Sequence, residues 1–213
     1  MNIRILFFSL SLAIFFYTSS IAQDRSESLL TEKDLSNFQQ LNGSATFHIE
    51  GDELVGTSKL QTRNSFLATK KSYGNFILEF EVLIENGLNS GVQFRSLSKE
   101  DYYKGAVHGY QCEIETSPRK WAGGIYDESR RGWLADLEEN EAGQKAFDRL
   151  GWNRYRILAR KDSIFTWINE VPAVALKDTV TASGFIAFQV HATDKTEPME
   201  VRWRNIRVRE ITE

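Results

Sequence analysis

Short runs of alternating apolar and polar residues, separated by turn residues, recur along most of the chain. From Phe76 to Val82 every second residue is apolar, and a period of two places those side chains on one face of a strand. Residues 46–57 and 154–176 alternate in the same way around short turns. Many short strands between frequent turns predict an all-β fold, a jelly-roll sandwich of two antiparallel sheets. We place the turns at Gly51–Asp52, Lys161–Asp162 and Asn169–Glu170.

Residues 117–150 break this rhythm. No succession of strands is evident there, although residues 139–150 have the composition of a short helix. We therefore expect a long insertion of loop and short helix, and such insertions in compact domains are more often functional than structureless. The insertion carries Trp121, Tyr126, Asp127 and Trp133.

The start of the chain has the features of a signal peptide. Arg4 precedes an apolar run from Ile5 to Tyr17, and small residues at 20 and 22 suit cleavage after Ala22. The run is shorter than the ~20 apolar residues of a membrane span. We therefore expect export to the periplasm or beyond it, without stable membrane insertion after cleavage. The expected segments are a signal peptide at 1–22, a lead-in at 23–37 and one jelly-roll domain at 38–213.

The composition narrows the classes of partner and chemistry. The 213 residues carry a net charge of -3 with the basic residues spread out, which gives no electrostatic basis for nucleic-acid binding. Cys112 is the only cysteine, so the sequence supports neither an intrachain disulfide nor a cysteine-based zinc site. Neither a glycine-rich nucleotide-binding motif nor the serine-hydrolase motif GxSxG occurs, so these classes lack support.

Three predicted strands carry an unusual set of polar residues on one face. Gln, Glu, Arg and His have planar donors and acceptors that can bind sugar hydroxyls, so neighbouring strands of this kind would line a polar concavity. The simpler alternative is a solvent face, with Arg95 and Arg119 as ion-pair partners of the two glutamates. Cys112, on the opposite face of its strand, is expected to be a core residue. The polar positions are Gln93, Arg95, Gln111, Glu113, Glu115, Gln189 and His191.

A series of short motifs runs through the chain in the order NSGVQFRS, GYQCEIE, GGIYDESRRGWL, GWNRYRILA, TWINEVPA, GFIAFQVH and VRWRNIRV. With these motifs the chain resembles the family once called a domain of unknown function, DUF1080, and now described as the 3-keto-disaccharide hydrolase domain. The resemblance runs from about Phe38 to the C-terminus. Two motifs depart from the commoner form of the family: GYQCEIE places Gln before Glu, and Asn169-Glu170 stands where many members have Asn-Gly.

The resemblance implies a concanavalin A-like jelly roll with a concave carbohydrate site, and action on glycosides already oxidised at C3 of a sugar ring. A ketone at C3 makes the C2 proton acidic, so a base near C2 would form an enolate that expels the C1 substituent, after which water adds. This route avoids the oxocarbenium-like step and the paired carboxylates of ordinary glycosidases. The family's polar positions fall at Arg95, Gln111, Glu113, Gln189 and His191.

Candidate roles follow from this chemistry. His191 or Glu113 is the expected base, and either Arg95 or a divalent metal is expected to stabilise the enolate. The metal is left open between Ca²⁺, Mn²⁺ and Zn²⁺, with His191, Glu113 and Glu115 as available ligands. An oxidised mono- or disaccharide or another glycoside is the expected partner. The expected substrate-binding residues are Gln93, Gln111, Glu115, Gln189, Tyr126, Asp127, Trp121 and Trp133.

Two hypotheses from other functional classes stay open. The same jelly roll serves as a non-catalytic carbohydrate-binding module of the cell envelope, which needs aromatic and hydroxyl-binding groups but no base. A structural or interaction domain of the envelope would need no polar concavity at all. The presence of a histidine together with carboxylates favours the enzyme.

Overall fold

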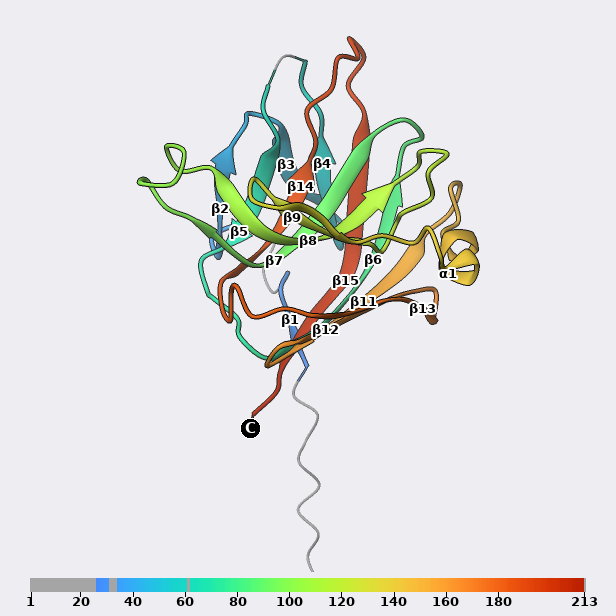
Figure 1. Cartoon of the computed structure of the whole chain (residues 1–213). Coiled ribbons are helices and arrows are strands. Elements are labelled where there is room, and N and C mark those ends of the chain that lie inside the picture. Colours follow the sequence, from blue (N-terminus) through green and yellow to red (C-terminus); the bar gives the residue numbers. More distant parts are fainter. Residues whose placement is uncertain (1–25, 31–33, 61, 213) are drawn as a thin grey trace, which may run out of the picture.

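The computed structural model describes residues 26–30, 34–60 and 62–212 and shows two antiparallel sheets around one core (Figure 1). The signal peptide expected at 1–22 lies outside the described residues. Within the described part, no helix is long and apolar enough to span a membrane.

Sheet A contains eight of the described strands and sheet B seven. The order in sheet A is β13 (Val171–Lys177), β12 (Ser163–Ile168), β11 (Asn153–Arg160), β6 (Phe76–Ile84), β15 (Glu200–Glu210), β4 (Glu53–Thr57) and β3 (Thr46–Glu50), with β1 (Glu27–Ser28) also paired to β15. The order in sheet B is β10 (Gly132–Ala135), β9 (Ile125–Glu128), β8 (Val107–Glu115), β7 (Asn89–Ser98), β14 (Phe185–Val190), β5 (Ser65–Thr69) and β2 (Phe38–Asn42).

The predicted hairpins are confirmed. β3 and β4 meet at Gly51–Asp52, and β11, β12 and β13 are joined at the two turns expected from the sequence. At the second of these turns, Asn169 and Glu170 both have a positive φ, 48° and 71°, the combination found in two-residue type I′ turns. These connections produce the all-β sandwich that the alternation predicts.

Apolar side chains from both sheets fill the core between them. The alternating set of β6 that begins at Phe76 is buried, and it belongs to the same cluster as Cys112 of β8. Cys112 is a core residue, as expected, and burial raises the pKa of its thiol. Successive side chains of a strand point to opposite faces, so Gln111, Glu113 and Glu115 face the outer side of sheet B.

The outer side of sheet B has a small apolar cluster of its own. Val107, at the start of β8, packs with Phe66 of β5 and with Phe185 and Ala187 of β14. Two strands, β7 and β14, separate β8 from β5 in the sheet, so the long β7–β8 hairpin (green in Figure 1) must curl over this face. A hydrogen bond from the Val107 N–H to Asn42 Oδ1, at 2.9 Å, holds the curled end to β2. Part of a strand face that would otherwise be hydrated is therefore buried.

The insertion contains two strands that the alternation did not predict. β9 and β10 have four residues each, and they extend sheet B beyond β8. Strands this short offer too few positions for a period of two to stand out. The expected short helix is confirmed as α1 (Glu141–Ala146), and the side chain of Asn140 caps it by accepting a hydrogen bond from the Gly143 N–H.

The described part of the lead-in joins sheet A. Glu27 and Ser28 pair with Val208 and Arg207 of β15, and Leu29 is buried in the core. Packing against the sandwich therefore begins upstream of residue 38, where the domain was expected to start.

Arg95 does not lie on the face where the alternation placed it. The register between β7 and β8 shifts at this residue, which has a φ of 47°, as in a β-bulge. Its guanidinium donates to Gly74 O at 2.7 Å, Lys161 O at 2.9 Å and Asn75 Oδ1 at 3.2 Å. Arg95 is 1% exposed and ties these loops of sheet A to sheet B.

Replacing Arg95 with methionine should lower the free energy of unfolding by about 3 kcal/mol, because buried carbonyl groups lose their donors. Urea unfolding followed by tryptophan fluorescence measures this loss. The matched control is Arg160→Met at the exposed end of β11, which should change stability by no more than about 0.5 kcal/mol. Equal stability of the Arg95 variant and the wild type would contradict a structural role for Arg95.

Candidate active site

A polar pocket of about 260 Å³ opens on the outer side of sheet B. Its walls come from β8, β9, β10, the first residue of β7 and the loops next to β5 and β14, so segments far apart in the sequence meet here. We call it the sheet B pocket. Its lining residues are Asn64, Asn89, Gln111, Glu113, Arg119, Tyr126, Glu128, Trp133 and His191.

Gly91 of β7 leaves room for a side chain that lines the pocket. The strand register sets Gly91 between Glu113 of β8 and Gln189 of β14. The Gln111 side chain lies over the glycine, and a Cβ atom at position 91 would be only 2.4 Å from Gln111 Cδ. The absence of a side chain at Gly91 therefore lets the Gln111 amide lie across the sheet.

A chain of hydrogen bonds between side chains leads from buried residues of β7 into the sheet B pocket, where Gln93 lies behind the lining and Gln111 and Glu113 belong to it. Ser96 Oγ donates to Gln93 Oε1 at 2.8 Å, and Gln93 Nε2 donates to Gln111 Oε1 at 2.7 Å. Gln111 Nε2 in turn donates to Glu113 Oε2 at 3.0 Å, while Asn89 Nδ2 donates to Glu113 Oε1 at 2.6 Å. Each carboxylate oxygen of Glu113 thus accepts a hydrogen bond from a side-chain amide.

Glu113 is the most strongly perturbed carboxyl group of the sheet B pocket. It is only 3% exposed, and burial raises its pKa to about 7. The amides of Asn89 and Gln111, and Arg119 at 4.0 Å, favour the carboxylate and limit this rise. A carboxyl group with a pKa near neutrality can both accept and donate a proton under physiological conditions.

Glu115, the next residue on the same face of β8, is held by other groups. Arg119 Nη2 lies 2.6 Å from its carboxylate, Ser117 Oγ donates to it at 2.8 Å, and the Trp121 N–H donates at 2.7 Å. Glu115 does not belong to the pocket lining. We therefore infer that Glu115 positions Arg119 and does not make the expected contact with substrate. The simpler alternative from the sequence was an ion pair between Glu115 and Arg119 on a solvent face. The ion pair is present, but the Glu115 carboxylate is buried.

Arg119 is also held between two indole rings. Its guanidinium carbon lies 4.8 Å from the ring centre of Trp121 and 4.8 Å from that of Trp133, and the two rings meet edge to face. Trp133 continues the wall toward Tyr126, whose ring centre is 5.3 Å away. Of the expected aromatic residues, Tyr126 and Trp133 thus line the pocket, while Trp121 supports Arg119.

His191 faces the sheet B pocket just beyond the end of β14. Its Nδ1 lies 2.7 Å from the carbonyl oxygen of Ala192. A carbonyl oxygen only accepts hydrogen bonds, so this contact assigns a proton to Nδ1, and in the neutral imidazole Nε2 then carries the lone pair. Asn64 Oδ1 accepts a hydrogen bond from the Ala192 N–H at 2.9 Å and fixes this segment.

Glu128 supplies a second carboxyl group to the pocket. Burial raises its pKa, and Asn64 Nδ2 lies 3.5 Å from its Oε1. Sequence reasoning did not identify Asn64, Asn89, Arg119 or Glu128 as pocket residues. Only Glu128 carried a usable signal, since it is two residues from Tyr126 and shares its strand face.

Gln189 lies beneath this site and is fully buried. Both polar atoms of its amide lack a hydrogen-bond partner among the described residues. An unpaired buried amide costs roughly 1–3 kcal/mol. Gln189 lies across Gly91 from Glu113 but does not line the sheet B pocket, so its expected substrate contact stays a prediction.

Asp127, another expected substrate-binding residue, faces away from the sheet B pocket. It is fully buried, forms an ion pair with Arg130 at 2.7 Å and pairs with Arg131. Arg131 also reaches Asp178, 2.8 Å away, beyond the end of β13. Asp127 therefore does not line the pocket but belongs to an ion-pair cluster that ties the β9–β10 turn to sheet A.

His191, Glu113 and Glu115 were the expected ligands of a divalent metal ion. Within residues 26–30, 34–60 and 62–212, no group of three or more His, Cys, Asp or Glu residues is placed to hold a metal ion. Because Glu115 is bound to Arg119, the expected set of His191, Glu113 and Glu115 is not assembled.

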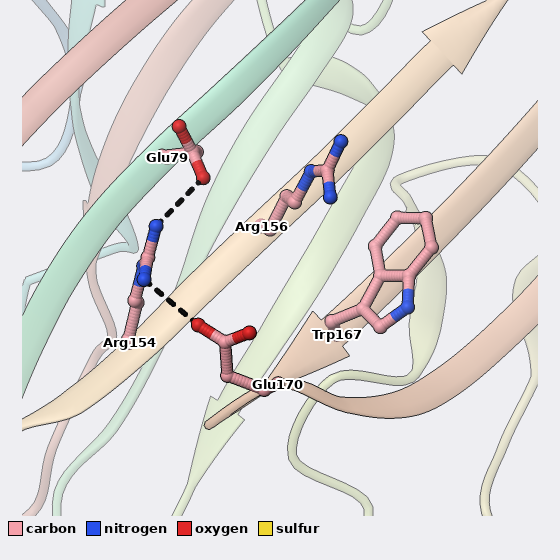
Figure 2. Close-up of a pocket in the computed structure, with 5 residues that line it drawn as sticks. All are labelled: Glu79, Arg154, Arg156, Trp167 and Glu170. Atoms are coloured by element: carbon pink, nitrogen blue, oxygen red, sulfur yellow. Dashed lines mark hydrogen bonds and ion pairs between the residues drawn. The ribbon is translucent and has the colours of Figure 1, made fainter.

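A smaller cavity of about 130 Å³ lies on the outer side of sheet A, and we call it the sheet A cavity (Figure 2). Its Arg154 pairs with Glu79 at 3.1 Å and with Glu170 at 2.8 Å. Arg156 lies over the ring of Trp167. The carboxylates here are already paired with a neighbouring arginine, whereas the sheet B pocket offers a buried carboxyl group that can exchange a proton. The sheet B pocket is the stronger candidate for chemistry.

Comparisons with solved structures support the jelly-roll fold. A candidate glycosyl hydrolase from Parabacteroides distasonis matches with a TM-score of 0.59 at 15% identity, covering 84% of this chain and 91% of that one. The carbohydrate-binding module CBM66 from Bacillus subtilis matches with 0.57 at 15% identity, covering 82% and 96%. A Bacillus subtilis protein of unknown function with a galectin-like fold matches with 0.61 at 15% identity, covering 87% and 94%. Such low identities show the fold alone.

The sequence comparisons are more specific. A search of curated proteins found no significant match. The family model for the 3-keto-alpha-glucoside-1,2-lyase-like domain matches residues 25–209, which include every residue of the sheet B pocket. This match confirms the resemblance seen in the sequence motifs and supports a function related to carbohydrates. The chain therefore belongs to the family of 3-keto-alpha-glucoside-1,2-lyase-like domains.

Proposed function

We propose that this protein is an exported enzyme that cleaves glycosides whose sugar ring carries a ketone at C3. The observation that carries the proposal is Glu113, a buried carboxyl group with a pKa of about 7 on the floor of a polar pocket. Membership of the family supports the choice of a 3-keto sugar as substrate. The signal-peptide pattern at 1–22 supports export.

In the proposed reaction the carboxylate form of Glu113 removes the proton from C2 of the sugar. The C–H electron pair forms an enolate with the C3 ketone and then the C1–C2 double bond, as the bond from C1 to the leaving oxygen breaks. An acid in the site protonates the leaving oxygen. Water then adds, its oxygen to C1 and a proton to C2, which gives the free 3-keto sugar. One water molecule is consumed, so the net reaction is hydrolysis.

The other residues of the sheet B pocket take complementary roles in this proposal. Arg119 and the amide of Asn89 stabilise the negative charge that develops on the C3 oxygen. Glu128, whose pKa is raised by burial, donates a proton to the leaving oxygen. His191, with its lone pair at Nε2, activates the incoming water. Arg119 thus takes the enolate-stabilising role that was expected of Arg95. The guanidinium of Arg95 is already hydrogen-bonded to backbone carbonyls in the loops of sheet A.

A non-catalytic carbohydrate-binding module is the second candidate. The aromatic wall of Tyr126 and Trp133 and the likeness of fold to CBM66 favour it. A binding module has no need for a buried carboxyl group with a pKa near 7, so Glu113 separates the two candidates.

Glu113→Gln should lower kcat for a 4-nitrophenyl 3-keto-glucoside roughly 100-fold or more, because the amide cannot accept the C2 proton. His191→Ala should also lower it, by roughly 10-fold or more. Release of nitrophenol from the 3-keto substrate and from its unoxidised parent measures both variants. The wild type should act on the keto form only.

Glu79→Gln in the sheet A cavity is the matched carboxyl-to-amide control and should leave kcat unchanged. Near-wild-type turnover of the Glu113 variant, with the fold intact by circular dichroism, would contradict the proposed base. Binding without turnover in the wild type would favour the carbohydrate-binding module.

The pH profile gives an independent prediction. Wild-type kcat/KM should rise as the pH increases through about 7, because only the carboxylate form of Glu113 accepts a proton. The residual activity of Glu113→Gln should lack this rise. Initial rates between pH 5 and 8, each corrected for spontaneous decay of the keto sugar, provide the test. A flat wild-type profile would contradict the role of Glu113.

A further inference from the structure

A third cavity, of about 270 Å³, has Glu115 in its lining. It is formed by the loop after β8, by α1 and by the segment that follows α1. We call it the cation cavity because three basic side chains line it. These are Lys120, Lys145 and Arg149.

The charge balance of the cation cavity is positive, in a chain whose net charge is -3. Glu115, the carboxylate in its lining, is already neutralised by Arg119 at 2.6 Å. Arg149 donates to the neutral side chain of Asn86 at 2.9 Å. Lys145 pairs with Glu141, but both side chains are largely exposed, and pairs of this kind contribute little. At least two full positive charges thus remain for a ligand.

The remaining walls of the cation cavity suit a polar, partly desolvated ligand. Thr116 Oγ1 accepts a hydrogen bond from the Gly87 N–H at 2.9 Å, so its own hydroxyl proton is available for donation. Gln144 adds an amide. Phe147 and Ala122 add apolar surface, which lowers the local dielectric and strengthens an ion pair formed there.

The position of the cation cavity connects it to the chemistry of the sheet B pocket. Glu113 and Glu115 are two residues apart on one face of β8, which corresponds to about 7 Å along a strand. Arg119 reaches both carboxylates, at 4.0 Å and 2.6 Å, and so lies between Glu113 of the sheet B pocket and Glu115 of the cation cavity. The two cavities are therefore neighbours along β8.

We propose that the cation cavity binds an anionic group, a carboxylate or a sulfate ester, on the part of the glycoside that leaves from C1. Lysine and arginine recognise both groups through charge-assisted hydrogen bonds. The orientation of the ligand rests on the proposed function, whereas the anion binding itself does not. The preferred substrates are then acidic glycosides.

The test is direct binding to the full chain by calorimetry in low salt, with three probes: methyl glucuronide, methyl glucoside 6-sulfate and uncharged methyl glucoside. At least one anionic probe should bind roughly 10-fold more tightly than the neutral probe, and added salt should weaken that binding. Preference for the glucuronide identifies a carboxylate ligand, and preference for the sulfate ester identifies a sulfated one. Equal dissociation constants for all three would overturn the proposal.

The double variant Lys145→Gln with Arg149→Gln should raise Kd for the preferred anionic probe roughly 10-fold and leave the neutral probe unchanged. The matched control, Arg160→Gln with Lys177→Gln, removes two exposed positive charges at the far ends of β11 and β13 and should leave all three constants unchanged. Wild-type binding of the anionic probe by the first double variant would overturn the proposal. If the enzyme is active but does not bind the anionic probes, only the proposed role of the cation cavity is contradicted. If it binds an anionic probe but does not cleave 3-keto glycosides, only the proposed hydrolysis is contradicted.

Discussion

The Glu113 carboxyl group is buried on a strand face that water usually covers, and the character of the sheet B pocket depends on this burial. Gln93, Gln111 and Glu113 are each 3% exposed or less, so their polar groups must satisfy one another. The chain of amides that ends at Glu113 does this, because each member accepts or donates a hydrogen bond that water would otherwise provide.

The same burial shapes the electrostatics. In water the Glu113 carboxyl would be fully ionised at neutral pH. Removal from water disfavours the charge, while two amides and Arg119 favour it, and the balance brings the pKa to about 7. Glu115 is also a glutamate on the same face of β8. Its carboxylate, however, is held by a direct ion pair with Arg119 and by a hydrogen bond from the Trp121 N–H, so it holds Arg119 in place. Two glutamates in one strand thus have different roles because of their partners.

The sequence alone predicted those features that depend on neighbouring residues in the chain. A period of two placed Gln111 and Glu113 on one face of β8, and the turn residues located the hairpins of sheet A. Arg95 was misplaced because a bulge changes the facing of a residue without a clear sequence signal. Asn64 was missed because it comes next to β8 only through β5, which reaches β8 by way of β14 and β7, segments that no local pattern brings together. Asn89, the first residue of β7, reaches the pocket through the β7–β8 hairpin, in which it lies opposite Glu115.

In the proposed reaction the protein breaks the C2–H bond of a 3-keto sugar, and the fate of that hydrogen can be followed by isotope exchange. A 3-keto glycoside would be converted in D2O and the released sugar examined by NMR, beside a reaction without enzyme and one with Glu113→Gln. Deuterium should appear at C2 of the released 3-keto sugar at the rate of cleavage, well above exchange in both controls. Cleavage with the C2 proton retained would rule out proton abstraction at C2 and would indicate direct displacement at C1.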